Sequence, residues 1–384
     1  MTRTIPLAVP LLGGNEGKYL QECLTTGMVS SVGPLVDRFE RAMAEYVEVP
    51  HAVAVNSGTA GLHVSLLVAG VRPGDLVLAP DLTFIASINA IRYAGAEPVL
   101  LDANRGTWQI DPEAVASWLE RHSNPSAGGT VERNSGRRIG AILCVHLMGM
   151  AADVAALGEI ARRYGIPLVH DAAQGVGARV RGRSLGATPD VAVFSFNGNK
   201  VLTAGGGGMI LTAHREWAER ARYLTTQARD DNLFFRHDAV GYNYRLSNLH
   251  AGVGLAQLER VEEFIARKRV IHRRYRDELA SCSELCWVEE QEGDRAAYWL
   301  SSCTIDGGRD RRDRVLRRLL DAGIEARPPY LLMHKQLPYR EAMRGPIGSA
   351  EEIEATGLHL PSSAGLPDQD QSYVIERLKA ALAT

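Results

Sequence analysis

Two spacings of apolar residues alternate along the first two thirds of the chain. Short β-branched runs predict buried strands, and stretches with apolar residues three and four positions apart predict amphipathic helices. The expected strands are 52–55, 76–79, 98–102, 139–146, 167–171, 191–196 and 208–212. The expected helices between them are 60–69, 84–93, 112–121 and 154–164. This alternation predicts an α/β domain with a mostly parallel sheet of seven strands and helices on both faces.

A polar stretch over residues 122–139 interrupts this alternation. It contains Gly128-Gly129 and the turn sequence Asn134-Ser135-Gly136. Because such dipeptides are typical of tight turns between short strands, the stretch predicts a β-hairpin that protrudes from the domain. A flexible loop is the alternative.

Beyond the last of these strands the pattern becomes mainly helical. The expected elements are a long helix over 247–279, a strand over 298–305, and helices over 312–322 and 371–382. Single hydrophobic cores stop growing near ~250–300 residues, so a chain of 384 residues predicts two domains. We expect a large domain over residues 1–250, and a long connecting helix with a small α+β domain over 251–384.

Composition narrows the class of protein. The formal net charge of −2 gives no reason to expect nucleic acid or an anionic membrane as a partner. The opening apolar residues are too few and too interrupted by proline for a signal peptide, and no run of ~18 apolar residues predicts a membrane span. An odd count of five cysteines without a C-x-x-C pair predicts reduced thiols in the cytoplasm. Cys282 and Cys286 lack further ligands nearby, so we expect no metal and interpret both as packing residues.

Candidate chemistry begins with Lys200, which follows the expected strand 191–196, and Asp171, which ends another expected strand. In parallel α/β sheets ligands bind beyond the carboxyl ends of the strands. There a lysine amine can bond to a carbonyl carbon, and a carboxylate can keep a pyridine nitrogen protonated. The two residues therefore suggest a pyridoxal phosphate site, with a solvated lysine at a strand end as the simpler alternative.

A phosphate group needs donors at the start of a helix, and Ser57-Gly58-Thr59 stands between an expected strand and an expected helix. Gly58 permits close approach of the backbone and Thr59 adds a hydroxyl group. An ordinary helix N-cap is the alternative.

Four further side chains have both a functional and a plain interpretation. Phe84 can lie against a pyridine ring or belong to the core. Gln174 can donate a hydrogen bond to the cofactor's phenolic oxygen or be a surface amide. His146 and His170 border strand ends, and we interpret both as structural residues.

Four segments in order resemble the DegT/DnrJ/EryC1/StrS sugar aminotransferases, and the resemblance spans essentially the whole chain. They are Ser57-Gly58-Thr59-Ala60, Asp171-Ala172-Ala173-Gln174, Phe194-Ser195-Phe196 with Lys200, and Gly241-Tyr242-Asn243-Tyr244-Arg245-Leu246-Ser247. The resemblance implies a pyridoxal phosphate enzyme of fold type I, a homodimer with active sites shared between its subunits. It also implies transfer of the amino group of L-glutamate to a keto group on a nucleotide-linked sugar.

The same resemblance assigns roles by matching position. It implies that Lys200 holds the cofactor covalently, that Asp171 pairs with its ring nitrogen, that Gln174 meets its phenolic oxygen and that Phe84 lies on the ring. Other matching residues contact the phosphate: Gly58, Thr59 and Ser195 from the same chain, and Asn243 from the other subunit. The implied sugar-nucleotide contacts are Ser31, Arg229, Arg327, Tyr330 and His334.

One departure from the family pattern bears on the substrate. Gly206 stands where the family usually has glutamate after the lysine. With Asn199-Lys200, the segment 225–229 and the polar insert, it resembles the branch that acts at C4 of UDP-linked 4-keto sugars, of bacillosamine and legionaminic acid type. That branch often departs from Asp-Ala-Ala-Gln, which this chain keeps.

Three alternatives stay open at this stage. They are an aminotransferase acting at a C3 keto group, a non-catalytic regulator that binds pyridoxal phosphate, and a sugar dehydratase of the same fold. In the dehydratases histidine replaces the lysine, so Lys200 argues against the third.

Overall fold

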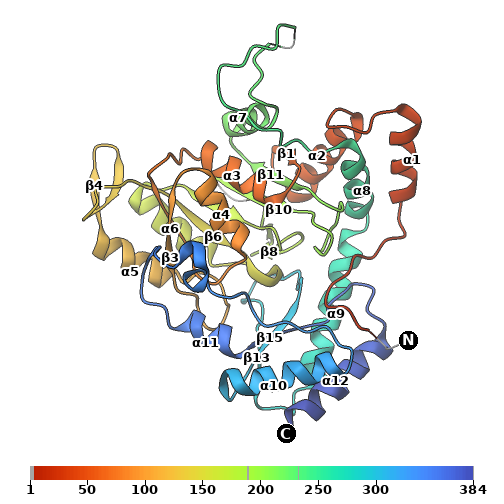
Figure 1. Ribbon diagram of the computed structural model, residues 1–384. Helices are drawn as coiled ribbons and strands as arrows, with labels where there is room; N and C mark the ends of the chain where they lie inside the picture. The colour runs from red at the N-terminus through yellow and green to blue at the C-terminus, as the bar shows by residue number, and fades with distance from the viewer. Residues whose placement is uncertain (1–3, 188–189, 232, 384) are drawn as a thin grey trace.

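The computed structural model describes residues 4–187, 190–231 and 233–383. Eight strands of this described part form the central sheet, in the order β1-β11-β10-β7-β6-β2-β3-β14 (Figure 1). Their bounds are β1 His51–Val55, β2 Leu76–Pro80, β3 Glu97–Leu101, β6 Ile139–Val145, β7 Leu168–Asp171, β10 Val191–Ser195, β11 Gly208–Thr212 and β14 Met343–Arg344. β11 pairs antiparallel with β1 and β10, and the other pairs are parallel. The predicted strands are confirmed, and β14 adds an edge strand too short to show in the sequence pattern.

Alternate residues of these strands face two layers of helices. Val77 and Ala79 pack in one core beneath α3, α4 and α7, whereas Leu76 and Leu78 pack in another beneath α5 and α6. The bounds are α3 Gly58–Val68, α4 Ile85–Tyr93, α5 Pro112–His122, α6 Val154–Tyr164 and α7 Arg215–Thr225. Helices on both faces are therefore confirmed, because a period of two sends neighbouring side chains to opposite sides of the sheet.

Three more helices cover the β10 and β11 end of the second face. They are α1 Glu16–Thr26, α2 Pro34–Val47 and α8 Asn248–Leu258, and α1 and α2 both pack on α8. The sequence reading assigned no element before β1, although Leu35, Phe39 and Met43 of α2 are buried at helical spacing.

The predicted single helix over 247–279 is wrong, since α8 is followed by a separate α9, Val261–Glu278. Arg260 lies between them at φ −119° and ψ 5°. Its backbone N–H bonds to Gln257, three residues back. The i→i−4 pattern is therefore interrupted without any proline or glycine that would signal a break.

The C-terminal part contains a small sheet in the order β12-β13-β15. Its elements are β12 Leu285–Trp287, β13 Ser301–Ile305, β15 Gly357–Leu360, α10 Gly308–Asp321, α11 Ser349–Thr356 and α12 Asp368–Leu382. The domain division after residue 250 stays a prediction, and two segments cross it. Ile5 pairs with Ile324 and packs in the C-terminal core, and β14 joins the large sheet.

The predicted hairpin is present as β4, Ser123–Ser126, paired antiparallel with β5, Gly129–Glu132. Figure 1 shows β4 projecting from the body of the molecule. The Asn134-Ser135-Gly136 turn lies outside this hairpin, between β5 and β6. It is held by the Glu132 carboxylate, which accepts from the backbone N–H groups of Asn134 and Ser135.

Short elements complete the described chain. They are β8 Arg179–Val180, β9 Arg183–Ser184 and the 3₁₀ turns η1 Leu147–Gly149, η2 Met333–Lys335 and η3 Leu337–Tyr339.

Among the described residues no helix has the length and apolarity needed to cross a membrane. Cys286, interpreted as a packing residue, is exposed instead, because it faces outward on the edge strand β12.

Candidate active site

A cavity of about 700 Å³ opens where several strands of the large sheet end. β1, β6, β7 and β10 bring their carboxyl ends to it, and a C-terminal segment around residues 299–330 closes its other side. Most of the predicted site residues line this cavity. They are Gly58, Thr59, Phe84, Asp171, Gln174, Ser195, Lys200, Arg327 and Tyr330.

The start of α3 forms one wall. Ser57 is the N-cap, and its hydroxyl group accepts from the backbone N–H of Ala60 at 3.0 Å. The N-cap alternative therefore holds for Ser57. A Cβ atom on Gly58 would lie 2.9 Å from the Cβ of Ser195, so a side chain at this position would close the gap between α3 and β10. The N–H groups at a helix start favour an anion, and these residues fit a phosphate group.

Asp171 lies on the cavity wall as a buried carboxylate. Its Oδ2 accepts from the Ser87 hydroxyl group at 2.7 Å, and its Oδ1 accepts from the Ala173 N–H at 3.0 Å. Burial raises the pKa of Asp171, while these hydrogen bonds and the charge of Lys200 oppose that rise. A buried carboxylate held in this way fits the ring nitrogen of pyridoxal phosphate, whose positive charge would favour its ionised form.

Ser87 was missed by the sequence reading. It lies in the first turn of α4, one turn after Phe84, and its oxygen is also 3.0 Å from the Thr83 hydroxyl oxygen. The signal available was a serine in the first turn of an expected helix, which alone does not identify its partner.

Lys200 lines the cavity and is half-buried. Burial lowers the pKa of Lys200 to about 8, and the charge of Asp171 opposes this change. The amine lies 4.1 Å from the centroid of the Trp299 ring. Since a pKa near 8 leaves part of the amine neutral around neutral pH, Lys200 can act as a nucleophile and as a proton carrier.

Gln174 and Phe84 both line the cavity. Gln174 is buried, its Oε1 accepts from the Met148 N–H at 2.7 Å, and its Nε2 lies 3.5 Å from the Tyr330 hydroxyl group. The surface-amide alternative is therefore wrong. Phe84 is 51% exposed at the start of α4, with its ring 5.5 Å from that of Tyr330. An ordinary core phenylalanine would be covered, so that alternative is wrong as well.

Three predicted residues lie elsewhere in the chain. Asn243, Ser31 and Arg229 line a second cavity of about 730 Å³, beside the loop that follows α7. In Figure 1 this loop reaches away from the body of the molecule. Asn56 lies between the two cavities, because it lines the first and donates to the backbone carbonyl of Asn243 at 3.1 Å. Within one chain these residues do not reach the Lys200 cavity.

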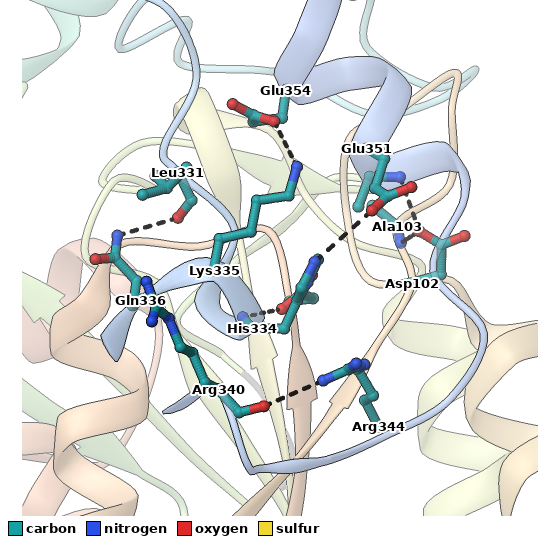
Figure 2. Close-up of polar contacts among 12 residues, drawn as sticks. Asp102, Ala103, Leu331, His334, Lys335, Gln336, Arg340, Arg344, Glu351 and Glu354 are labelled. Atoms are coloured by element: carbon teal, nitrogen blue, oxygen red, sulfur yellow. Dashed lines mark hydrogen bonds and ion pairs between the residues drawn. The ribbon is translucent and has the colours of Figure 1, made fainter. Parts of the chain in front are cut away.

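His334 is not among the residues that line either cavity. Its Nδ1 lies 2.5 Å from Oδ2 of Asp81, and its backbone N–H donates to Oδ1 of the same carboxylate at 2.9 Å. Figure 2 shows its ring directed toward Glu351, with the neighbouring Lys335 directed toward Glu354. Its contacts connect the end of β2 with α11, so His334 links these two elements.

His146 and His170 form a buried pair. The Ala152 N–H donates to Nδ1 of His146 at 3.1 Å, so Nε2 of His146 carries the proton and donates to Nδ1 of His170 at 3.0 Å. Burial lowers the pKa of both rings, that of His170 to about 3. Three of their four ring nitrogens are engaged with each other and with the backbone, whereas Nε2 of His170 is buried without a partner among the described residues. Cys144 lies beside them. Because Nε2 of His146 carries a proton in this arrangement, it offers no free lone pair to the Cys144 sulfur.

A lysine and a carboxylate at the strand ends of a mostly parallel sheet, beside a phosphate-binding helix start, define a pyridoxal phosphate-dependent transferase of fold type I. The chain belongs to the DegT/DnrJ/EryC1/StrS aminotransferase family, which matches residues 10–379. It is therefore a pyridoxal phosphate-dependent aminotransferase, and the non-catalytic alternative is set aside.

Individual relatives cover almost the whole chain. GDP-perosamine synthase of Caulobacter vibrioides is 39% identical over 380 residues, with 98% of both chains covered. GDP-perosamine synthase of Escherichia coli O157:H7 is 34% identical over 375 residues, with 97% of both covered. The crystal structure of the aminotransferase TlmJ from Streptoalloteichus hindustanus superposes with a TM-score of 0.89 at 32% identity, covering 99% of both chains.

Proposed function

We propose that the protein transfers the amino group of L-glutamate to the C4 keto group of a nucleotide-linked 4-keto-6-deoxy sugar. The observation that carries the proposal is the shared cavity of Lys200 and Asp171, which has room for a sugar beside the cofactor. The relatives described above are GDP-perosamine synthases. They favour GDP as the nucleotide and C4 as the position. The UDP-linked substrate predicted from the sequence has no support among them.

Different residues of the cavity would bind different groups of the cofactor. Gly58, Thr59 and Ser195 would bind its phosphate, Asp171 its ring nitrogen, and Lys200 its carbonyl carbon. When bound, pyridoxal phosphate supplies an electron sink that lets an amino group leave one carbon and join another.

Lys200 would also move the proton that each half of the reaction requires. Its pKa of about 8 lets Nζ take up and release a proton near neutral pH. The hydrogen bonds that Ser87 and Ala173 donate to the two oxygens of Asp171 would favour its ionised form. Arg327 and Tyr330, on the opposite wall, would contact the substrate.

The second cavity supports a homodimer with shared sites. Asn243, Ser31 and Arg229 lie outside the Lys200 cavity of their own chain, yet the family resemblance gives them contacts with cofactor phosphate and substrate. A second copy would bring them to the site across a twofold axis, as an isologous interface allows.

A substrate panel tests the proposal. The purified protein with bound cofactor is supplied with L-glutamate and with 4-keto-6-deoxy sugars linked to GDP, UDP and dTDP, together with 3-keto analogues. We expect the GDP-linked 4-keto sugar to be converted to its 4-amino product with the highest kcat/KM. Preference for a 3-keto sugar would contradict C4 amination, and preference for a UDP-linked sugar would restore the earlier prediction.

A further inference from the structure

Trp299 makes a contact with Lys200 that the proposed reaction does not use. Its ring face lies 4.1 Å from the amine of Lys200. Its indole N–H donates to the backbone carbonyl of Asn199 at 2.6 Å. One side chain therefore touches the reactive amine and also holds the backbone next to it.

The sequence pattern gave no sign of this role. It predicted a strand from residue 298, in which Trp299 would be an ordinary sheet residue. The strand β13 begins only at Ser301, because Tyr298 takes a left-handed conformation at φ 44°. Such a conformation is costly for a non-glycine residue and persists only where its surroundings fix it.

Two contacts fix the backbone at this point. The N–H of Ala297 donates to the carbonyl of Gly149 at 2.8 Å. The amine of Lys268, on α9, donates to the carbonyl of Trp299 at 3.1 Å and to that of Ser362 at 2.5 Å. Trp299 and Lys268 are each only 4% exposed.

Lys268 is an unusual residue for a purely structural contact. Its hydrogen bonds within the described residues go to the backbone carbonyls of Trp299 and Ser362, and burial lowers its pKa to about 7. A buried amine without a carboxylate partner is costly to maintain, and an apolar side chain of similar volume would avoid that cost. What Lys268 adds is a fixed position for the Trp299 backbone.

We propose that Trp299 is a positioning residue for Lys200, and that Lys268 holds Trp299 in place through its backbone carbonyl. The proposal rests on the proposed role of Lys200 as the cofactor lysine, and it is independent of the sugar and its nucleotide. The Trp299 face would keep the Lys200 amine beside Asp171 in the intervals when the amine is not bonded to the cofactor.

Three variants and two matched controls test this. Trp299→Leu removes both contacts, Trp299→Phe keeps an aromatic face but loses the N–H, and Lys268→Met keeps the length of the side chain without its donor. Trp217→Phe on α7 and the exposed Lys379→Met on α12 control for loss of a tryptophan or a lysine elsewhere. Thermal unfolding identifies the variants that fold.

The first measurement needs no turnover. Apoenzyme is mixed with pyridoxal phosphate, and covalent attachment to Lys200 is followed by absorbance. We expect attachment to slow by about tenfold or more in Trp299→Leu and by less in Trp299→Phe and Lys268→Met, because displacement of a reacting group by ~1 Å can cost up to ~100-fold. Both controls should match the wild type.

The second measurement is the half-reaction with glutamate carrying deuterium at Cα. In the three variants we expect a slower maximal rate, a larger isotope effect and a half-saturating concentration within about twofold of wild type, since only proton transfer by Lys200 is impaired. A merely structural change would not raise the isotope effect selectively.

Borohydride reduction and peptide mass analysis identify the lysine that carries the cofactor. Attachment elsewhere would overturn the role of Lys200 and this inference with it. Attachment at Lys200, with rates and isotope effects unchanged in folded Trp299→Leu, would overturn this inference alone. If Trp299→Leu fails to fold, an unchanged Trp299→Phe has the same meaning. Lys268→Met indistinguishable from Lys379→Met would remove Lys268 from the proposal.

Discussion

The two cavities of the chain differ in how their walls are built. The Lys200 cavity is formed largely by residues at the ends of strands whose order and register are fixed by the central sheet. The Asn243 cavity lies beside the loop that follows α7, and the hydrogen bond from the Asn56 side chain to the Asn243 carbonyl joins it to the Lys200 cavity. A sheet places residues that are distant in the sequence side by side within one chain, whereas the residues of a protruding loop are not placed by such a register.

The exposed side chains of that loop sharpen the comparison. Leu233, Phe234 and Phe235 follow one another and are 76%, 79% and 63% exposed. Three consecutive exposed apolar residues are unusual on a monomeric surface and typically mark an interaction site. The Lys200 cavity is formed within one chain, while the exposed apolar residues of the Asn243 loop are consistent with the homodimer proposed above.

The largest effect is expected from Lys200→Ala. Transamination should fall by about a thousandfold or more, because the covalent attachment and the proton carrier are lost together. The fold and most of the cofactor affinity should remain, since Asp171 and the start of α3 are unchanged. Single-turnover kinetics and equilibrium dialysis with the cofactor measure the two quantities, with Lys379→Ala as control. Turnover near the wild-type value would contradict the assignment.

Asp171→Asn should have the next largest effect. A neutral amide cannot stabilise the protonated ring nitrogen, so the half-reaction with glutamate should slow by about a hundredfold while cofactor affinity changes much less. Stopped-flow absorbance gives the rate. An unchanged rate would mean that Asp171 only supports the wall of the cavity.

Subunit mixing tests the Asn243 side of the comparison. Lys200→Ala and Asn243→Ala proteins, each inactive, are combined under conditions that exchange subunits. If Asn243 completes the partner's site, each mixed dimer contains one site with both defects and one with neither. Activity should then return to about half the wild-type value per mixed dimer. Demonstrated exchange without recovery would place Asn243 in its own subunit's site.

The smallest effect is expected from Ser87→Ala. The Ser87 hydroxyl group donates to Asp171 and holds the pKa of that carboxyl down. Without it the pKa of Asp171 rises, so the acid limb of the pH–rate profile for the glutamate half-reaction should move to higher pH. The maximal rate should fall only about threefold to tenfold, the size expected for the loss of one typical hydrogen bond worth about 1 kcal/mol. The control is Thr212→Ala, which removes a buried hydroxyl group distant from the cavity. A pH–rate profile of Ser87→Ala identical to that of the wild type would exclude this role for Ser87.

Prediction from the sequence worked best where a repeating pattern fixes the geometry. The strand ends were predicted, and with them the meeting of Asp171 and Lys200, because parallel strands bring their carboxyl ends to one edge. Ser87 and Trp299 were not predicted, because each acts through a tertiary contact that no local pattern encodes. His334 matched the family by position, yet its contacts with Asp81 depend on a packing arrangement that the sequence does not show.

One feature of the sheet bears on how the site is assembled. β10 and β11 are antiparallel neighbours, and the segment between them, which carries Lys200, is closed by the bond from the Phe196 N–H to the Gly207 carbonyl at 2.9 Å. The bond between Ser87 and Asp171 instead joins residues 84 positions apart. Contacts between near neighbours cost less chain entropy to close, so in refolding the lysine's turn should become protected before the carboxylate finds its partner. Pulse-labelling hydrogen exchange measures the order in which the two regions become protected. The opposite order would contradict this prediction. The turn that carries Lys200 would then form before the rest of the cofactor site. The protein would become able to bind the cofactor only when the late, long-range contacts form.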